Sequence, residues 1–548
     1  MLCSHMCNGE ECFRAVFFQN CFLFQSVQEL MFKKPKPCGI LLSALMALQA
    51  GDISAASYND LPESFRTGWE ALLHYNGAES VISGGSSFFL SPNGNTAPDL
   101  ELESTMDFLE KNPKAWCVYP ARYYLIYGRL PEDFSVCPDF YEYSRNIGIE
   151  KLSVVFASED ETSPISTMGH VFIVLEGKNS RGLTKRHNFG FVADTEGSAS
   201  LFWNFLTGSI IGRYTLTPHD DTIYRYISEE HRTLWEYELN LGPDELRMLF
   251  LHLYELKTHK ISYSFFTNNC ATGLNRVIAA VKPEFAYSSA TNIVTPVEYV
   301  KHINRQNLTS GIIIRPSETD KLYLEKELPL NPLKSPPTSR ISAGYLYDSR
   351  YGSGMSFDFL PLYSDLHEDS SYTSKINQSQ FLRISAEIFP EHARITGLRI
   401  IDIHSLPNIN YEKFKINFGL DLHSDVTGTG GKLYPDLHAG TGIAFSSYGF
   451  IPYIETDGGI HYEKGGANFY ASLTGGLMYR SGSFGRMTAY ARSYAATEND
   501  YRGFKSAIAL IYSKQLSENF WLKINGEHFF IKNSRNLTKI GTEISFRF

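Results

Sequence analysis

Long apolar runs are missing from this 548-residue chain. No window holds eighteen consecutive apolar residues, which excludes a bundle of membrane-spanning helices. A basic excess is missing too: 50 Lys and Arg face 59 Asp and Glu, for a formal net charge of -9, which argues against a general nucleic-acid binder. A membrane β-barrel remains open, because its apolar residues alternate and never form a run. The length is enough for two domains plus processing segments.

The start of the chain is predicted to be a processing segment. Between Met31 and Pro37 three lysines form a positive region, residues 39–50 are mostly apolar, and small residues follow at 54–56. This order is typical of a secretory signal peptide with cleavage near residue 56. We therefore interpret residues 31–56 as a signal peptide and residues 1–30 as an over-extended start. A short buried helix is the alternative for the apolar stretch.

Cysteine is scarce after residue 56, where only Cys117, Cys137 and Cys270 remain. An odd number in an exported protein favours one disulfide and one free thiol. We expect Cys117 and Cys137 to pair, because they flank a segment rich in Tyr and Pro; two unpaired cysteines are the alternative. Cys270 is then the thiol that needs an explanation.

Residues 57–316 mix helical and strand patterns. Pro243 and two acids open a stretch with apolar residues at helical spacing up to Leu256, which predicts a helix. The run from His170 to Leu175 predicts a strand, so we expect a compact α+β domain. Four prolines lie in the polar residues 317–339, which we interpret as a linker.

Residues 340–548 follow a period of two. Apolar and polar residues alternate at 413–423, 467–480 and 539–548. Such segments, separated by turn residues, are the signature of an antiparallel transmembrane β-barrel, and we count about 12 strands. A soluble β-sandwich would alternate in the same way. The barrel is favoured because the polar face carries Lys, Arg, Asp and His, which a wet lumen tolerates.

The predicted barrel implies a location. A signal peptide followed by a barrel indicates the outer membrane of a Gram-negative bacterium, with the α+β domain on the periplasmic side. The terminal Phe548 resembles the carboxyl-terminal signature that the barrel-assembly machinery recognises. We therefore expect that machinery and membrane lipids or lipoproteins as partners, and no nucleic acid.

The free cysteine lies at a predicted helix start. Apolar residues at helical spacing follow Cys270, and Asn268 or Asn269 is the expected cap. The unpaired N–H groups and the positive end of a helix dipole favour a thiolate, so we expect a lowered pKa for Cys270. The same N–H groups can stabilise an oxyanion.

A thiol enzyme also needs a base, and His170 is the best candidate. It opens a predicted strand directly after Gly169. A second strand over 187–194 could pair with it and supply His187 or Asn188 as the group that orients the imidazole. Tyr263 and Asn269 are further supporting candidates. A buried structural cysteine and a core histidine would give the same sequence spacing.

We expect neither a cofactor nor a metal. His219, Asp220 and Asp221 form a local group of ligand-type residues, but no second group at metal spacing accompanies them. Short groups of this kind are usually solvated turns.

Six separated motifs together resemble a known family. They are Trp116–Arg122, Cys137-Pro138, Gly169–Phe172, Asn188–Phe191, Trp235–Leu239 and Phe265–Cys270. In this order they resemble the Lnb amino-terminal periplasmic domain family, over roughly residues 100–310. A strand histidine followed by Asn-Cys at a helix start is also similar to the permuted papain-like fold of lecithin–retinol acyltransferase and NlpC-type relatives.

The resemblance implies a function. Lnb-like proteins are implicated in N-acylation of bacterial lipoproteins, so His170 would be the base and Cys270 the nucleophile that carries an acyl group as a thioester. Lnb itself continues into membrane helices, whereas this chain continues into a predicted barrel. We therefore expect a thiol-dependent acyltransferase or acyl hydrolase. A cysteine peptidase or amidase, and a non-enzymatic barrel with a periplasmic docking domain, are the alternatives.

Overall fold

The computed structural model describes residues 57–548 with internal gaps. Left out are residues 83–86, 161–165, 195–203, 205–209, 258, 290–292, 319, 322–330, 369–372, 374, 425–431, 464–465, 498–504 and 532–534. The predicted signal peptide and over-extended start lie outside the described residues, as does part of the predicted linker.

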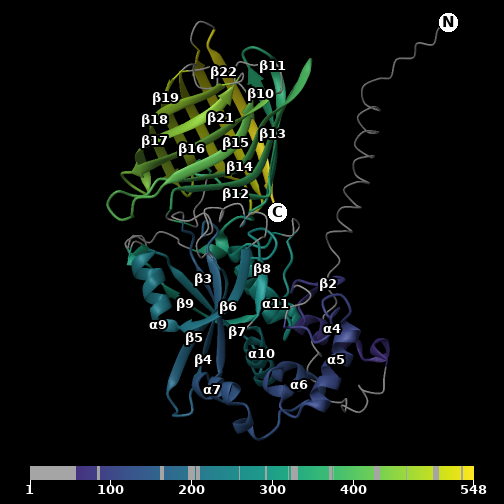
Figure 1. The fold of residues 1–548 in the computed structure, drawn as a ribbon. Coiled ribbons are helices and arrows are strands. Elements are labelled where there is room, and N and C mark those ends of the chain that lie inside the picture. The colour runs from purple at the N-terminus through teal and green to yellow at the C-terminus, as the bar shows by residue number, and fades with distance from the viewer. Residues whose placement is uncertain are drawn as a thin grey trace, which may run out of the picture. The chain divides into compact units, whose positions relative to one another are not determined.

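The first folded part is built on a seven-stranded sheet in the order β8-β6-β5-β4-β3-β7-β9 (Figure 1). All neighbouring pairs in this sheet are antiparallel. Its strands are β3 (Lys151–Ala157), β4 (His170–Lys178), β5 (Thr184–Ala193), β6 (Ile210–Pro218), β7 (Leu234–Leu239), β8 (Lys260–Tyr263) and β9 (Thr309–Arg315). A separate small hairpin joins β1 (Tyr75–Asn76) to β2 (Glu79–Ser80).

Helices pack against both faces of this sheet. They are α4 (Glu63–Leu72), α5 (Pro98–Lys111), α6 (Pro120–Tyr127), α7 (Pro138–Asn146), α9 (His219–Tyr224), α10 (Pro243–Leu256), α11 (Cys270–Ala279) and α12 (Pro296–Arg305). Helix α11 contacts β4 and β5, and α9 contacts β5 and β6. The predicted α+β class is confirmed. Across the described part of the chain, every helix is too short or too polar to cross a membrane.

The elements that position the candidate site agree with the sequence patterns. Helix α10 begins at Pro243, and Glu245 accepts a hydrogen bond from the N–H of Gly242 at 2.7 Å. Strands β4 and β5 pair antiparallel, with Ile173 opposite Phe189. Cys117 and Cys137 form a disulfide, which leaves Cys270 as the free cysteine of the described residues.

The second folded part is a closed antiparallel barrel of 12 strands, as predicted (Figure 1). These are β10 (Arg340–Asp348), β11 (Gly352–Leu360), β13 (Asn377–Phe389), β14 (His392–Ser405), β15 (Asn417–Ser424), β16 (Leu433–Ala444), β17 (Gly449–Glu463), β18 (Gly466–Ser481), β19 (Gly485–Ala496), β20 (Ser506–Gln515), β21 (Phe520–Phe530) and β22 (Leu537–Arg547). The short β12 (Leu362–Ser364) adds to β13. Closure comes from β10 pairing with β22 and from β11 pairing with β13.

The two faces of the barrel differ as the alternation predicts. On β22, Ile540 and Ile544 are 50% and 53% exposed on the outside, whereas Ser545 and Arg547 are buried inside. This is the pattern of a barrel with a lipid-facing apolar surface and a polar interior. The predicted alternating segment at 413–423 is only partly correct, because β15 begins at Asn417.

A loop folds into the barrel after β12. Glu368 accepts hydrogen bonds from Arg340 of β10 and Arg547 of β22. Asp365 forms an ion pair with Lys523 of β21 at 3.0 Å, and His367 stacks on Tyr490 of β19 at 5.8 Å. Partners from four strands hold this loop, residues 365–368, within the lumen.

The lipid-facing assignment generates a prediction at the midpoint of β18. Leu473 is 59% exposed on the outer face. Leu473→Arg should destabilise the folded barrel by about 2–4 kcal/mol, because an arginine on the lipid face near the bilayer midplane must be desolvated. The measurement is denaturant unfolding of the full chain refolded in lipid vesicles. Leu473→Ala is the matched control; equal losses for the two variants would contradict a lipid-facing position.

Candidate active site around Cys270

Cys270 is the first residue of α11, and the cap beside it is formed by Asn269. The Asn269 Oδ1 atom accepts hydrogen bonds from the N–H groups of Ala271 at 2.9 Å and Thr272 at 3.0 Å. Its Nδ2 atom donates to the backbone oxygens of Phe265 and Val294, both at 3.0 Å. The asparagine therefore satisfies the helix start and ties it to two loops, which fixes the position of the thiol.

Close packing holds the start of α11 on the sheet. A side chain at Gly273 would meet Phe191 of β5 at 2.7 Å, so the helix needs a glycine there to approach so closely. The Phe191 ring packs at a tilt against Tyr263 of β8, with the ring centroids 5.2 Å apart. The Tyr263 hydroxyl lies within hydrogen-bond reach of both the thiol and the N–H of Cys270.

The N–H of Val171 and the Tyr263 hydroxyl lie within hydrogen-bond reach of the Cys270 sulfur, whereas the nearby N–H of Ala271 already donates to Asn269. The first two donors each stabilise negative charge on sulfur. The thiol is nevertheless 4% exposed, and burial raises the pKa of Cys270 above its ordinary value. The predicted lowering of this pKa is therefore wrong. The free-energy cost of removing a thiolate from water exceeds the stabilisation that these donors and the helix N-terminus provide.

His170 begins β4 directly after Gly169, whose φ of +82° few other residues adopt. A side chain at Gly169 would meet the Phe156 ring at 2.5 Å. The imidazole of His170 stacks on Tyr226 with centroids 6.3 Å apart, and burial together with Arg232 lowers its pKa to about 3. At neutral pH the imidazole is therefore uncharged, and in this resting environment it is a weaker base than an ordinary histidine.

The thiol at the start of α11 and the imidazole at the start of β4 form no hydrogen bond with each other in the described residues. The thiol meets the N–H of Val171, one residue after His170. The Val171 side chain packs in the same core as Cys270, whereas the His170 ring stacks beside Phe172 and Tyr226. Side chains alternate across a strand, so the ring and the thiol belong to opposite faces of β4.

Arg232 is a buried cation that sequence reasoning missed. Its Nε donates to the Ser158 oxygen at 2.6 Å, and its guanidinium lies 4.9 Å from the Tyr226 ring centre. Its charge favours the thiolate of Cys270 and disfavours the imidazolium of His170. The only sequence signal is an arginine just ahead of the β7 strand, and nothing in that pattern places it near the thiol.

The two residues expected to orient His170 do not reach it. Strand register places Asn188 opposite Val174 and His187 opposite Leu175, well along β4 from His170. Asn188 Oδ1 instead bonds to His219 Nδ1 at 2.8 Å. The expectation that either one orients the imidazole is therefore wrong.

The local group at residues 219–221 opens α9. The second ring nitrogen of His219 bonds to Arg186 at 2.8 Å, so both of its nitrogens have protein partners. Burial and Arg186 lower the pKa of His219 to about 4. These contacts join α9 to β5, so His219 acts as a structural residue.

Comparisons with known proteins support the domain assignment. Residues 139–306 match the family model described as the Lnb N-terminal periplasmic domain. Residues 64–128 match a second model, described as a domain of unknown function, DUF7843. A search of curated proteins found no match. The matched domain and the closed barrel place the chain in the outer membrane, with its α+β domain in the periplasm.

Solved structures similar to the chain include several porins. The NanC porin is 8% identical, with 38% of this chain and 100% of that chain covered and a TM-score of 0.26. A loop L8 deletion mutant of OmpT, an outer membrane protein of Vibrio cholerae, is 5% identical, with coverages of 38% and 97% and a TM-score of 0.21. An anion-selective porin from Comamonas acidovorans is 11% identical, with coverages of 73% and 98% and a TM-score of 0.19. These low scores carry no argument, and the barrel is defined by its own strand pairing.

The raised pKa of Cys270 predicts slow alkylation at neutral pH. The rate of iodoacetamide labelling should rise with pH to a midpoint above the ordinary cysteine value of about 8.5, because the thiol stays protonated below its raised pKa. Peptide mass spectrometry at Cys270 measures the rate. Tyr263→Phe removes one donor and should move the midpoint higher. The urea-unfolded chain provides the ordinary reference, and a folded midpoint below it would show that the prediction is wrong.

Proposed function

Because the chain joins an Lnb N-terminal periplasmic domain to an outer-membrane barrel, we propose that it is a thiol-dependent acyltransferase or acyl hydrolase. Cys270 is the nucleophile and His170 the base. The substrates are acyl groups of membrane lipids or lipoproteins, which the barrel keeps within reach by anchoring the domain to the membrane.

One observation carries this proposal: the convergence of the Val171 N–H and the Tyr263 hydroxyl on the sulfur of Cys270. A structural cysteine needs no such donors, because a neutral thiol is a weak hydrogen-bond acceptor. Donors at this point are placed to stabilise negative charge that develops on sulfur.

The protonation states fit a dyad that is neutral at rest. The pKa of Cys270 is raised and that of His170 is lowered to about 3, so the resting pair is thiol and imidazole. As sulfur attacks an acyl carbonyl, the imidazole takes the thiol proton and returns it to the leaving group, which leaves a thioester on Cys270. Water or an amine then attacks the thioester and releases the thiol.

The surroundings of the thiol favour an acyl chain. Phe191, Tyr263 and Phe265 belong to the same buried core as Cys270. Apolar and aromatic walls recognise a hydrocarbon chain through burial alone, whereas a peptide backbone requires partners for its own polar groups.

A non-enzymatic docking domain is the second candidate. It is favoured by the arrangement of His170 and Cys270 on opposite faces of β4 without a hydrogen bond between them in the described residues. Catalytic hydrogen bonds are often long in free enzymes and tighten only with substrate. Reactivity therefore discriminates the two candidates better than resting geometry.

The deciding experiment is acyl transfer to Cys270. The full chain, in lipid vesicles, is incubated with an alkynyl fatty-acid p-nitrophenyl ester, and hydroxylamine-sensitive label is located by peptide mass spectrometry. Cys270→Ala should abolish the label. His170→Gln should slow labelling by about 100-fold or more, because a general base contributes at least that much.

The matched control is His187→Gln, which removes a histidine of the neighbouring strand that does not reach the dyad. Its labelling rate should stay within a few-fold of the unchanged protein. Label that persists at other sites in Cys270→Ala, or equal rates for His170→Gln and His187→Gln, would favour the docking domain. Cleavage of peptide amides with no acyl-ester turnover would favour a cysteine peptidase instead.

A further inference from the structure

The barrel lumen contains a histidine and carboxylate group that is separate from the thiol site. An Asp-x-His sequence occurs in three successive strands: Asp402 and His404 in β14, Asp421 and His423 in β15, and Asp436 and His438 in β16. Because side chains two residues apart share a face of a strand, all six point to the lumen, where they are buried or half-buried.

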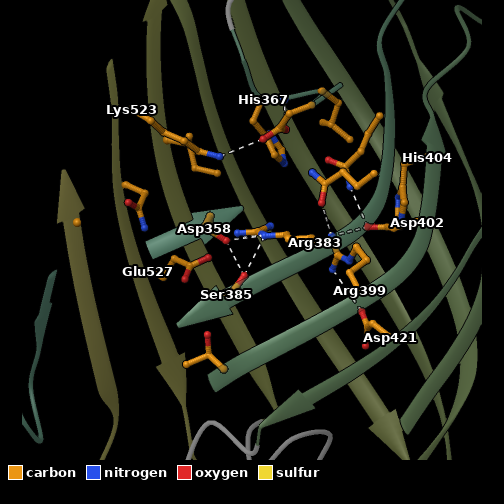
Figure 2. Close-up of a pocket in the computed structure, with 18 of the residues that line it drawn as sticks. Asp358, His367, Arg383, Ser385, Arg399, Asp402, His404, Asp421, Lys523 and Glu527 are labelled. Carbon is orange, nitrogen blue, oxygen red and sulfur yellow. Dashed lines mark hydrogen bonds and ion pairs between the residues drawn. The ribbon is translucent and has the colours of Figure 1, made fainter. Parts of the chain in front are cut away.

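Three of these side chains converge. The His404 Nε2 atom is 2.8 Å from Asp402 Oδ1, and the His438 Nε2 atom is 3.7 Å from the same oxygen. The three ligand-type atoms lie within 4.8 Å of one another. Figure 2 shows Asp402 and His404 side by side on the lumen wall. Two imidazole nitrogens and one carboxylate oxygen are a usual ligand set for zinc.

A carboxylate contacts the Nδ1 atom of each histidine, on the ring side away from Asp402. His404 Nδ1 lies 2.6 Å from Glu455 Oε1, and His438 Nδ1 lies 3.2 Å from Asp436 Oδ1. A carboxylate on Nδ1 fixes the ring so that Nε2 is turned toward Asp402, and this second layer is typical of histidines that bind metal.

The Asp402 carboxylate is oriented in the same way. Its Oδ2 atom accepts a hydrogen bond from Gln378 at 2.9 Å and forms an ion pair with Arg399 at 2.6 Å. Asp402 is 2% exposed, and its Oδ1 atom makes no hydrogen bond of acceptable geometry although His404 lies close to it. The buried oxygen is thus directed at the two histidines.

A glycine makes the approach possible. Gly419 lies on β15, the strand between β14 and β16. It pairs with Asp402 of β14 on one side and with His438 of β16 on the other. A side chain at this position would meet His438 Nε2 at 2.5 Å and Asp402 Oδ1 at 3.3 Å. Only a residue without a side chain leaves the space in which these atoms face each other.

The surrounding cavity is negatively charged and large enough to hold a cation with a further ligand. It has a volume of about 490 Å³ and is lined by nine carboxylates and five Lys or Arg side chains, so negative charge is in excess. The group itself lines this cavity, which leaves space for water or another ligand beside a bound cation.

We propose that Asp402, His404 and His438 bind a divalent transition metal ion, for which Zn²⁺ is the best fit. Bonds of about 2.0–2.1 Å at tetrahedral angles place ligand atoms roughly 3.3 Å apart, and the separations of 2.8 and 3.7 Å lie on either side of that value. The cavity side supplies the remaining coordination position. This proposal departs from the sequence-based expectation of no metal.

A second set of residues could compete for the ion: His404, Glu455 and Asp457 also lie within 4.8 Å of one another. It would use His404 Nδ1, which Glu455 already holds, and it contains a single histidine. The set with two histidines is preferred because imidazole suits Zn²⁺ better than an additional carboxylate does.

The test uses the full chain in detergent, with the affinity tag removed and with Cys270→Ala as background, so that the result is independent of the proposed thiol chemistry. After treatment with EDTA, Zn²⁺ is titrated in competition with a chromophoric chelator. One ion should bind per chain. X-ray absorption at the zinc edge should show nitrogen and oxygen at about 2.0–2.1 Å with imidazole scattering and no sulfur.

Variants assign the ligands. His438→Ala should weaken binding by more than about 100-fold, and Glu455→Gln by about 10–100-fold, since second-layer carboxylates contribute that much. Gly419→Ala should weaken binding without removing any ligand atom. The matched controls are Asp457→Asn and His423→Gln, which change the same lumen but should leave the affinity within a few-fold.

Each variant is first shown to fold by its heat-modifiable migration on gels. A loss of zinc binding can then be assigned to the changed side chain and not to an unfolded barrel. No stoichiometric Zn²⁺ binding by the background chain, or a sulfur-containing coordination shell, would overturn the proposal. Loss of binding in Asp457→Asn with retention in His438→Ala would overturn it as well, because the ion would then lie in the competing set.

Discussion

The barrel depends on one constraint: a bilayer offers no water to unpaired backbone groups, so every strand that faces lipid must be paired on both edges. Pairing of β10 with β22 and of β11 with β13 meets this requirement by closing the ring. Closure in turn forces alternate side chains into a confined interior. Charged residues there must find partners, as Glu368 does with Arg340 and Arg547.

This constraint also explains which features the sequence predicts. The alternation at 467–480 is clear because one face of β18 meets lipid and the other meets the lumen. The alternation at 413–416 is equally regular but precedes β15, because a period of two marks an extended chain and does not say where strand pairing begins. A cap at Asn268 or Asn269 was predictable because capping involves only neighbouring residues, and the structure shows that the cap is Asn269.

Features that depend on distant parts of the chain were not predictable. The helix start argued for a thiolate at Cys270, whereas burial by the sheet and its neighbours raises the pKa of the thiol. Strand register decides that Asn188 contacts His219 and not His170. In the barrel the repeated Asp-x-His pattern is visible in the sequence, but its convergence requires knowing that Gly419 stands between Asp402 and His438.

The pairing of the first barrel strand with the last also imposes an order on biogenesis. β10 cannot complete the ring until β22, at the carboxyl end of the chain, has been synthesised and exported. The seven-stranded sheet is already complete at Arg315, before any barrel residue emerges. During export from the amino end, every strand of this sheet therefore reaches the periplasm while the membrane anchor is still an open, unassembled chain.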